Sequence, residues 1–376
     1  MGLSDSGERR YPFFSAIRSS GGSMSASKSA SLSALRTWHR PLTLFAALMA
    51  VWAVGSAVGL ALDDRMLVGA PIWAKPLKFA VSFVGYALSL AWMVSLAAAA
   101  RPRLRRPAWW AGTVVVATSL VEMLLITGQA IRGRQSHFNQ RTPLDEQIYS
   151  AMANTVVVLW TATLVIAVLL FRTRVVDRAT TWAIRIATVL ALTGAGLGFL
   201  MATPTEEQLA VEDPPVLGAH SVGVPDGGPA MPLTGWSTTG GDLRVPHFFG
   251  MHALQLLPLL VLVLAALAGR FALLRGERVR VGLTLVASGV YAAAFALVTW
   301  QALRGQAVVH PDGTTLGAAA VILVGGVLGV IAVLLLGRGA TPVEEGHGHA
   351  GGEVVAGDLG AHRQGDEVVG PGAQLR

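Results

Sequence analysis

Eight apolar stretches, each long enough to cross a lipid bilayer, constrain this chain more than any other feature. A helix needs about 20 mostly apolar residues to span a hydrocarbon core about 30 Å thick. The stretches run approximately over residues 42–62, 79–99, 108–130, 149–171, 181–202, 247–269, 281–303 and 316–337. Hydrophobic residues make up 53% of the chain and charged residues 14%, against roughly 25% charged residues in a soluble domain. The sequence therefore predicts an all-α integral membrane protein with eight transmembrane helices.

Arginine is concentrated in the connections that follow the even-numbered spans. Residues 101–106, 172–178 and 270–280, after the second, fourth and sixth spans, together contain eleven arginines. The positive-inside rule places such connections in the cytoplasm, so both termini are predicted to be cytoplasmic. The net charge of +7 is then mostly a signal for membrane orientation. We expect the lipid bilayer as a partner and no nucleic acid.

Residue usage also indicates the type of cell and limits the cofactors. Lysine occurs only three times in a chain rich in Arg, Ala, Gly, Val and Leu, which is typical of a GC-rich bacterial genome. The expected location is therefore the bacterial cytoplasmic membrane, as a multi-pass protein. Because there is no cysteine, disulfides, iron–sulfur clusters and any thiol-ligated cofactor are excluded. A b-type haem or a divalent metal, if bound, would need His, Met, Glu or Asp ligands.

The spans divide the chain into two halves with polar ends. Residues 1–40 and 339–376 are predicted to be a disordered cytoplasmic arm and a disordered cytoplasmic tail. Residues 41–172 form the first four-helix half and residues 173–338 the second. Within the second half, residues 203–245 form a long external loop, dense in Pro, Gly and acidic residues. Loops of this length are lids, binding loops or disordered segments, and the sequence leaves these alternatives open.

The two halves carry a partly repeated motif at the external end of their third spans. The third span ends in "QAIRGRQSH" and the seventh in "QALRGQAVVH". The matched residues are Gln129, Ala130, Arg132 and Gly133 in the first half and Gln301, Ala302, Arg304 and Gly305 in the second, each set followed by a histidine, His137 or His310. Weaker matches in the other spans keep the same order. We interpret them as two parallel four-helix repeats; the alternative is coincidence among eight similar helices.

Glu122 is the only acidic residue well inside a predicted span. An ionisable group buried at that depth costs several kcal/mol unless it is paired, protonated or open to water, so it is a functional candidate. Ser119, Glu122, Gln129 and Arg132 share one helix face that leads to the external end. The alternative is a protonated glutamic acid that ties two helices together.

The polar stretch 132–145, "RGRQSHFNQRTPLD", lies between the third and fourth spans. Thr142, Pro143 and Asp145 match the start of a helix, with Asp145 near its N-terminus as a cap. Arg132, His137 and Asn139 are then free for chemistry. Together with Glu122 they are our candidate catalytic residues.

Histidines near the external ends of the second half are candidate cofactor ligands. His252 lies inside the sixth span, and His310 follows the seventh. Haem ligation needs two facing histidines, for which His252 with His310, or His137 with His252, are possible pairs. His247 lies about 140° from His252 around the helix, and we expect it to meet a headgroup or the external loop. A zinc site made of His137, His252 and Glu122 or Asp145 is a further possibility.

Basic residues at the same end predict a site for an anion or a lipid headgroup. Lys75, Lys78, Arg134 and Arg244, with Arg132 nearby, could hold a phosphate or a carboxylate. The alternative is interfacial anchoring of the second span by snorkelling lysines. We therefore expect a lipid or small-molecule ligand at the outer face.

The span plan resembles that of the haem A synthase family. That family has eight spans, cytoplasmic termini, two parallel four-helix halves and histidines toward the outer side. The resemblance implies the architecture alone, because this second span has Lys78 and Ser82 where the family has histidine, and the cysteine-bearing loop is missing. The phrases "KPLKF", "RGRQSHFN" and "GDLRVPHFFGMHALQ" are also similar to stretches in uncharacterised bacterial multi-pass membrane proteins, which supply no activity.

Three classes of function fit these observations. The first is a membrane-embedded enzyme or a haem- or metal-linked redox protein, with an outward-facing polar site between the two halves. The second is a transporter or lipid-handling protein in which Glu122 is the coupling site. The third is a structural or assembly protein of the membrane.

Overall fold

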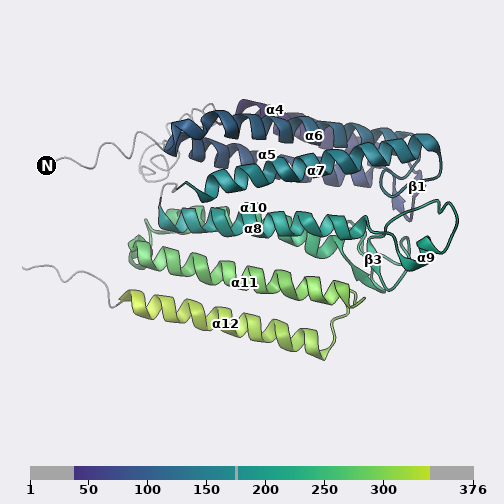
Figure 1. Ribbon diagram of the computed structural model, residues 1–376. Helices are drawn as coiled ribbons and strands as arrows, with labels where there is room; N and C mark the ends of the chain where they lie inside the picture. Colours follow the sequence, from purple (N-terminus) through teal and green to yellow (C-terminus); the bar gives the residue numbers. More distant parts are fainter. Residues whose placement is uncertain (1–37, 174–176, 339–376) are drawn as a thin grey trace, which may run out of the picture. The chain divides into compact units, whose positions relative to one another are not determined.

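Eight long helices form the framework of the protein, in a computed structural model that describes residues 38–173 and 177–338 (Figure 1). They are α4 (Arg40–Leu62), α5 (Ala74–Ala100), α6 (Arg105–Ile131), α7 (Pro143–Phe171), α8 (Arg178–Met201), α10 (Arg244–Leu267), α11 (Glu277–Leu303) and α12 (Gly313–Arg338). All eight are long and apolar enough to cross a membrane. The predicted all-α class with eight long apolar helices is confirmed and is consistent with a membrane protein. Most of the predicted arm and all of the predicted tail lie outside the described residues.

All eight helices begin earlier than hydropathy predicts, and α4, α7 and α8 do so at residues with side-chain caps. Helix α7 begins at Pro143, and the side chain of Thr142 accepts a hydrogen bond from the backbone N–H of Asp145. The cap is thus Thr142, and Asp145 lies in the first turn. Helix α8 is capped in the same way by Asp177, which accepts from the N–H of Thr180 at 2.9 Å.

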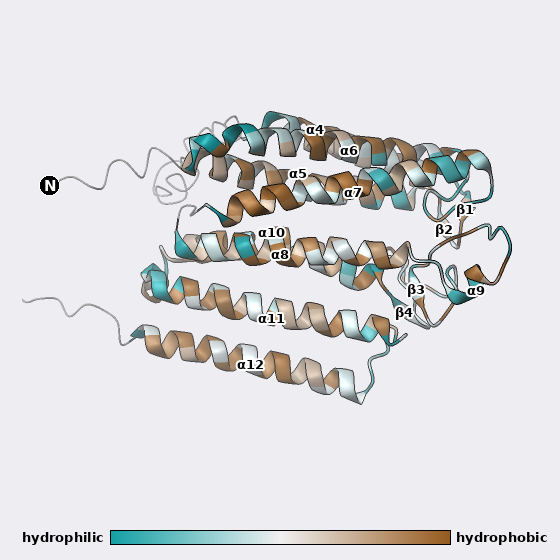
Figure 2. Cartoon of the chain, viewed as in Figure 1, coloured by the Kyte–Doolittle hydropathy of each residue, from teal (hydrophilic) through white to brown (hydrophobic). Residues whose placement is uncertain are grey.

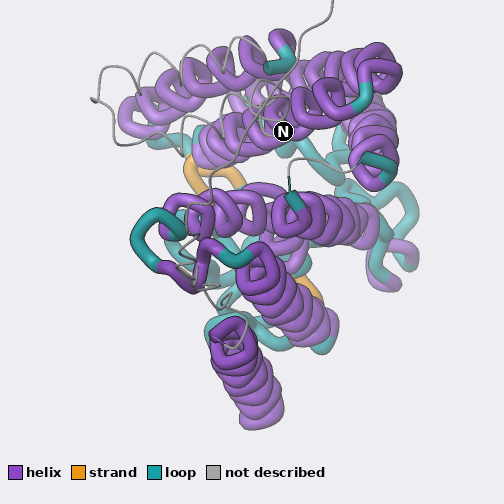
Figure 3. The backbone as a smooth tube through the Cα atoms, turned by 90° about the vertical axis from the view of Figure 1, so that its left-hand side faces the viewer, coloured by secondary structure: helices purple, strands orange, loops and turns teal. Residues whose placement is uncertain are grey.

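The helices run side by side and pack mainly against their neighbours in sequence (Figures 1 and 3). Helix α5 contacts α4 and α6, and α6 also contacts α7, while α10 contacts α8 and α11, and α11 also contacts α12. Contacts of α7 with α8 and of α5 with α10 join these two sets. Figure 2 shows hydrophobic residues along the helices and hydrophilic ones gathered near their ends and in the connections. Apolar outer faces of this kind match a lipid bilayer.

Most of the connections lie at one end of the bundle, which we call the loop-rich end. There α4, α6, α8 and α11 end and α5, α7, α10 and α12 begin. The connections include an antiparallel pair of short strands, β1 (Met66–Leu67) and β2 (Ala70–Pro71), a short helix α9 (Glu206–Leu209), and a second antiparallel pair, β3 (Ser221–Val222) and β4 (Gly241–Asp242). The opposite end has two 3-10 helices, η1 (Pro102–Leu104) and η2 (Ala272–Arg275).

The long segment 203–245 is folded against the first half of the chain. The backbone N–H of Leu217 donates to the carbonyl of Phe138 at 2.9 Å, and that of Gln140 donates to the carbonyl of Pro215 at 3.0 Å. Within the segment, the side chain of Gln208 donates to the carbonyl of Gly218 at 3.0 Å. These bonds place the middle of the segment beside residues 137–140 at the loop-rich end.

A close approach of two backbones joins α8 to α10. A Cβ atom added to Gly194 would lie 2.7 Å from the Cα atom of Gly250, so a larger residue has no room there. Gly55, in α4, has no such neighbour, since a Cβ atom there would meet nothing within 4 Å.

Replacement of Gly194 by valine is expected to destabilise the protein by about 1–3 kcal/mol, because the added side chain forces α8 and α10 apart. Gly196→Val is the matched control, since a Cβ atom there meets nothing within 4 Å. Thermal unfolding of the purified protein measures both. Equal melting temperatures for the two variants would contradict the close approach.

Candidate functional site

A contact between Lys75 and His137 lies at the centre of the polar groups at the loop-rich end. The Nζ atom of Lys75, in the first turn of α5, lies 3.0 Å from Nδ1 of His137. An ammonium group only donates, so Nδ1 accepts and the neutral imidazole carries its proton on Nε2. Burial lowers the pKa of His137 well below its ordinary value, and the nearby positive charge of Lys75 lowers it further. His137 is therefore neutral at physiological pH.

Aromatic rings surround His137 on several sides. Its ring centroid lies 6.2 Å from that of Phe79, 6.1 Å from that of Phe138 and 6.5 Å from that of Tyr149. Phe138 also contacts the ring of His220, with the centroids 4.9 Å apart. The imidazole thus lies in an apolar environment, which explains why burial has the largest effect on its pKa.

His220 and Asp226, in the long segment, form a hydrogen-bonded pair that our reading of the sequence missed. Oδ2 of Asp226 lies 2.8 Å from Nδ1 of His220, and the carboxylate also accepts from the backbone N–H groups of His220 and Ser221. Burial raises the pKa of Asp226, but these hydrogen bonds outweigh it and hold the pKa well below its usual range. No spacing signal in this Pro- and Gly-rich segment predicted the pair.

His247, in the first turn of α10, completes a cluster of imidazoles. Its Nδ1 lies 2.8 Å from the carbonyl oxygen of Gly194. His137, His220 and His247 all lie within electrostatic range of one another. Burial lowers the pKa of His220, and the carboxylate of Asp226 offsets this only in part. The three histidines, His137, His220 and His247, together with Lys75, which contacts the first of them, are called the imidazole cluster below.

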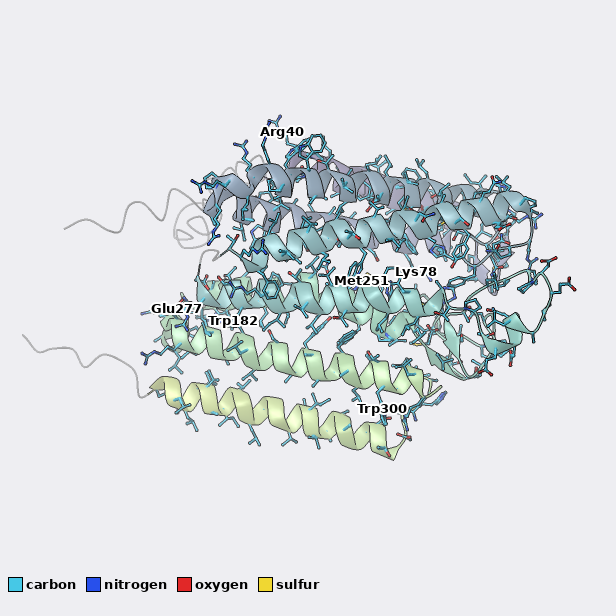
Figure 4. All side chains as sticks on the ribbon, in the orientation of Figure 1. Arg40, Lys78, Trp182, Met251, Glu277 and Trp300 are labelled. Carbon is cyan, nitrogen blue, oxygen red and sulfur yellow. The ribbon has the colours of Figure 1, made fainter. Side chains whose placement is uncertain are left out.

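Lys78 and Arg244, two of the predicted anion-binding residues, donate hydrogen bonds to the backbone of residues 234 and 235. The ammonium of Lys78 donates to the carbonyl of Thr234 at 3.0 Å, and Nη2 of Arg244 donates to the carbonyl of Gly235 at 2.6 Å. Arg244 also forms a bidentate ion pair with the buried carboxylate of Asp242. Lys78, labelled in Figure 4, lies toward the same end of the bundle as Trp300. Arg134 is exposed and does not join this group.

Arg132 and Asn139 have structural partners, contrary to our expectation that they are free for chemistry. Nη1 of Arg132 donates to Oδ1 of the fully buried Asp145 at 3.1 Å and to Gln129 at 2.5 Å. Asn139 donates to the carbonyl of Gln135 at 3.0 Å, accepts from the N–H of Arg141 and pairs with Val216 in an isolated β-bridge. Of the candidate residues in 132–145, only His137 faces the cluster.

The similar motif at the end of α11 forms matching bonds. The amide of Gln301 donates to the carbonyl of Ala307, as that of Gln129 donates to Gln135, in both cases six residues on. Arg304 donates to Asp312, as Arg132 donates to Asp145. In both copies the arginine that follows the third helix is thus bound to the first turn or cap of the next helix.

His252 and His310 are not brought into contact. Nδ1 of His252 lies 2.7 Å from the carbonyl oxygen of Phe248, and its ring stacks on that of Phe248 at 4.0 Å. Nδ1 of His310 lies 2.9 Å from the carbonyl oxygen of Thr238, beside a cavity of about 680 Å³ that Arg304 also lines. Within residues 38–173 and 177–338, no group of three or more His, Asp and Glu is placed to hold a metal ion. The zinc arrangement considered from the sequence is therefore not formed.

Glu122, in the middle of α6, is buried in the protein, with 2% of the residue exposed. Its carboxyl group has a hydrogen bond with the hydroxyl of Thr155 in α7 and interacts electrostatically with Lys75. Ser119, one turn away, is fully buried, and its hydroxyl has no hydrogen-bond partner in the part of the chain that the structure describes. The residues predicted to share one face of α6 thus fall into two groups. Ser119 and Glu122 are buried in the middle of the helix, whereas Gln129 and Arg132 bind Asp145.

Arg132→Met is expected to destabilise the protein by about 1–3 kcal/mol, because it removes the charged partner of a buried carboxylate. Arg304→Met is the matched change in the second half. It should cost less than about 1 kcal/mol, since both Arg304 and Asp312 are partly exposed. Thermal unfolding of the two variants compares them. A larger loss for Arg304→Met would show that the Asp145 network does not have the assigned role.

The geometry at the loop-rich end thus combines two lysines and three imidazoles, one of which is bound to a carboxylate, between the first and second sets of helices. Residues from α5, from the connection before α7, from the long segment and from α10 all contribute. Comparison of the chain with models of known protein families, with curated proteins and with solved structures finds no match.

Proposed function

We propose that this chain is a membrane-embedded enzyme that binds an anionic group at the loop-rich end and transfers a proton there with His220. The contact between His220 and Asp226, beside Lys75 and His137, is the observation that carries the proposal. The substrate class is an anionic amphiphile or small molecule with a phosphate or carboxylate group.

The lysines support anion binding because neither is paired with a carboxylate among the described residues. Lys75 contacts an imidazole and Lys78 a backbone carbonyl. Arg244 differs, since Asp242 already pairs with it. Two ammonium groups beside neutral imidazoles form a region of positive potential that favours an anion.

The pair of His220 and Asp226 supports acid–base chemistry. A carboxylate at Nδ1 fixes the imidazole tautomer and leaves Nε2 as the basic nitrogen. Burial lowers the pKa of His220, so the neutral, basic form persists to lower pH than for an exposed histidine. Such an imidazole can accept a proton from a bound hydroxyl group or water and return it later. A haem-linked reaction has less support, because no contact joins His252 to His310.

We further propose that the loop-rich end faces outward and that the halves are two parallel copies. The arginine-rich connections support the orientation, because they lie at the opposite end, around η1 and η2. The duplication is supported by the matching bonds of Arg132 and Arg304. The positive backbone φ angles of Gly133 and Gly305, 65° and 74°, support it as well. The substrate then arrives from the outer leaflet or the external solution.

The orientation can be tested with single thiols, since the chain has no cysteine. Leu233, which is 93% exposed at the loop-rich end, and the exposed Ala272 at the opposite end are each changed to cysteine. A membrane-impermeant maleimide should label Leu233→Cys in intact spheroplasts, and Ala272→Cys only after permeabilisation. The reverse pattern would place the site on the cytoplasmic side.

The proposed binding is tested by thermal shift and native mass spectrometry of the purified protein. The probes are inorganic phosphate, dioctanoyl phosphatidylglycerol and dioctanoyl phosphatidylcholine. An anion that binds should stabilise the protein, by about 2.7 kcal/mol at a hundred times its Kd. Lys75→Met and Lys78→Met should weaken this effect at least tenfold in Kd, whereas Arg134→Met, which removes an exposed cation, should not. A response to phosphate alone identifies a free anion, and one to phosphatidylglycerol alone identifies a headgroup.

The same experiment is extended to turnover of the anion that binds, followed by mass spectrometry of its products. His220→Gln is expected to reduce the rate by about 10²–10⁴-fold, as loss of a general base does. Asp226→Asn removes the negative charge that raises the pKa of His220, so the acid limb of the pH–rate profile should move to lower pH. His310→Gln, outside the cluster, is the control. Binding without any turnover would reject the enzyme and leave a binding protein.

A further inference from the structure

Glu122 lies well away from the end of α6, within a helix that is long and apolar enough to cross a membrane. Eight residues separate it from Ala130, near the end of α6, which is about 12 Å at 1.5 Å per residue. Its side chain is also buried within the protein. A carboxyl group in such a position is stable only if it is protonated or if its charge is compensated.

The hydrogen bond to Thr155 suits both protonation states of Glu122. The Thr155 hydroxyl carries one hydrogen, and three acceptors lie within reach of it: the Glu122 carboxyl group and the backbone carbonyls of Ala151, at 3.1 Å, and Met152, at 2.9 Å. When Glu122 is charged, the hydroxyl donates to the carboxylate. When Glu122 is protonated, its O–H donates to the hydroxyl oxygen, and Thr155 donates to a carbonyl of its own helix. Neither state leaves a polar hydrogen without an acceptor.

The positive charge of Lys75 favours the charged state of Glu122 over its protonated state. It is the charged group with which Glu122 interacts electrostatically among the described residues, and it lies on α5, which packs against α6. Helix α7 presents Thr155 there, and its Asp145 is bound to Arg132 at the loop-rich end. Helix α4 has Arg40 at its first residue as its one charged side chain. Lys75 and Glu122 are too far apart for an ion pair, so the carboxyl group can lose or gain its proton without breaking a salt bridge.

We infer that Glu122 is a reversible proton-binding site within the first four helices, and that the charge of Lys75 controls its occupancy. The ligand is a proton, and the site is distinct from the His220 pair, although it shares Lys75 with the proposed anion-binding site. Its second supporting feature is the buried hydroxyl of Ser119, one turn along α6, which has no hydrogen-bond partner among the described residues. The inference does not depend on the proposed enzymatic activity.

The site is tested by infrared titration of the purified protein from about pH 5 to about pH 9, the range in which buried carboxyl groups titrate. The wild type should show the carbonyl-stretch band of a protonated carboxyl that disappears as the pH rises. The band should be missing in Glu122→Gln. Lys75→Met should move its midpoint upward by about half to one pH unit, because loss of a positive charge favours the protonated form.

Matched variants and a second probe keep the test decisive. Lys78→Met removes a nearby lysine that does not interact with Glu122 and should leave the midpoint unchanged. Dicyclohexylcarbodiimide, which reacts with protonated carboxyl groups in apolar surroundings, should label Glu122 with the same pH dependence. A band that persists at every pH would identify a permanently protonated structural residue. Either that result or an unchanged midpoint in Lys75→Met would overturn the inference.

Discussion

The cost of an unsatisfied polar group in hydrocarbon governs the placement of almost every polar side chain in this protein. Within the bilayer the backbone can satisfy itself only in helices, and side chains such as Thr188 and Thr284 donate to carbonyls of their own helix. The remaining polar groups gather where the helices end. At the loop-rich end they satisfy one another, as the bonds between Arg132 and Asp145 and between Arg244 and Asp242 show. The imidazole cluster lies among these structural networks, which fix its position.

Hydropathy alone predicted the eight helices, because a helix that crosses a membrane needs about 20 mostly apolar residues, and such stretches are visible in the sequence. It also located the polar end, and within it Lys75 and His137. It did not distinguish residues that hold the fold from residues free for chemistry. Arg132 and Asn139 looked reactive, yet they bind Asp145 and Gln135. Such pairings depend on how a connection folds back on a helix end, which periodicity does not encode.

The histidines also show that the sequence did not predict the contacts of individual side chains. His252 was the preferred ligand because it lies deeper in its helix, but its Nδ1 faces a carbonyl of the preceding turn. His247 points instead toward α8 and the cluster. His220 carried no signal, since its partner Asp226 lies six residues on in a segment without periodicity. The proposed duplication adds a contrast: positions that match Glu122 and Lys75 are Ala294 and Val245, so only the first half has an acid and a lysine at these positions.

Helix α12 differs from the other seven in what holds it in place. Among the long helices it packs against α11, and none of its most apolar stretch is buried in the protein. Its 26 residues are about 39 Å long, whereas the hydrocarbon core is about 30 Å thick. Hydrophobic mismatch of this size is relieved by tilting. The tilt of α12 in a membrane therefore depends mainly on one helix contact, that with α11, in which Gly326 and Gly329 lie against Val290 and Val286.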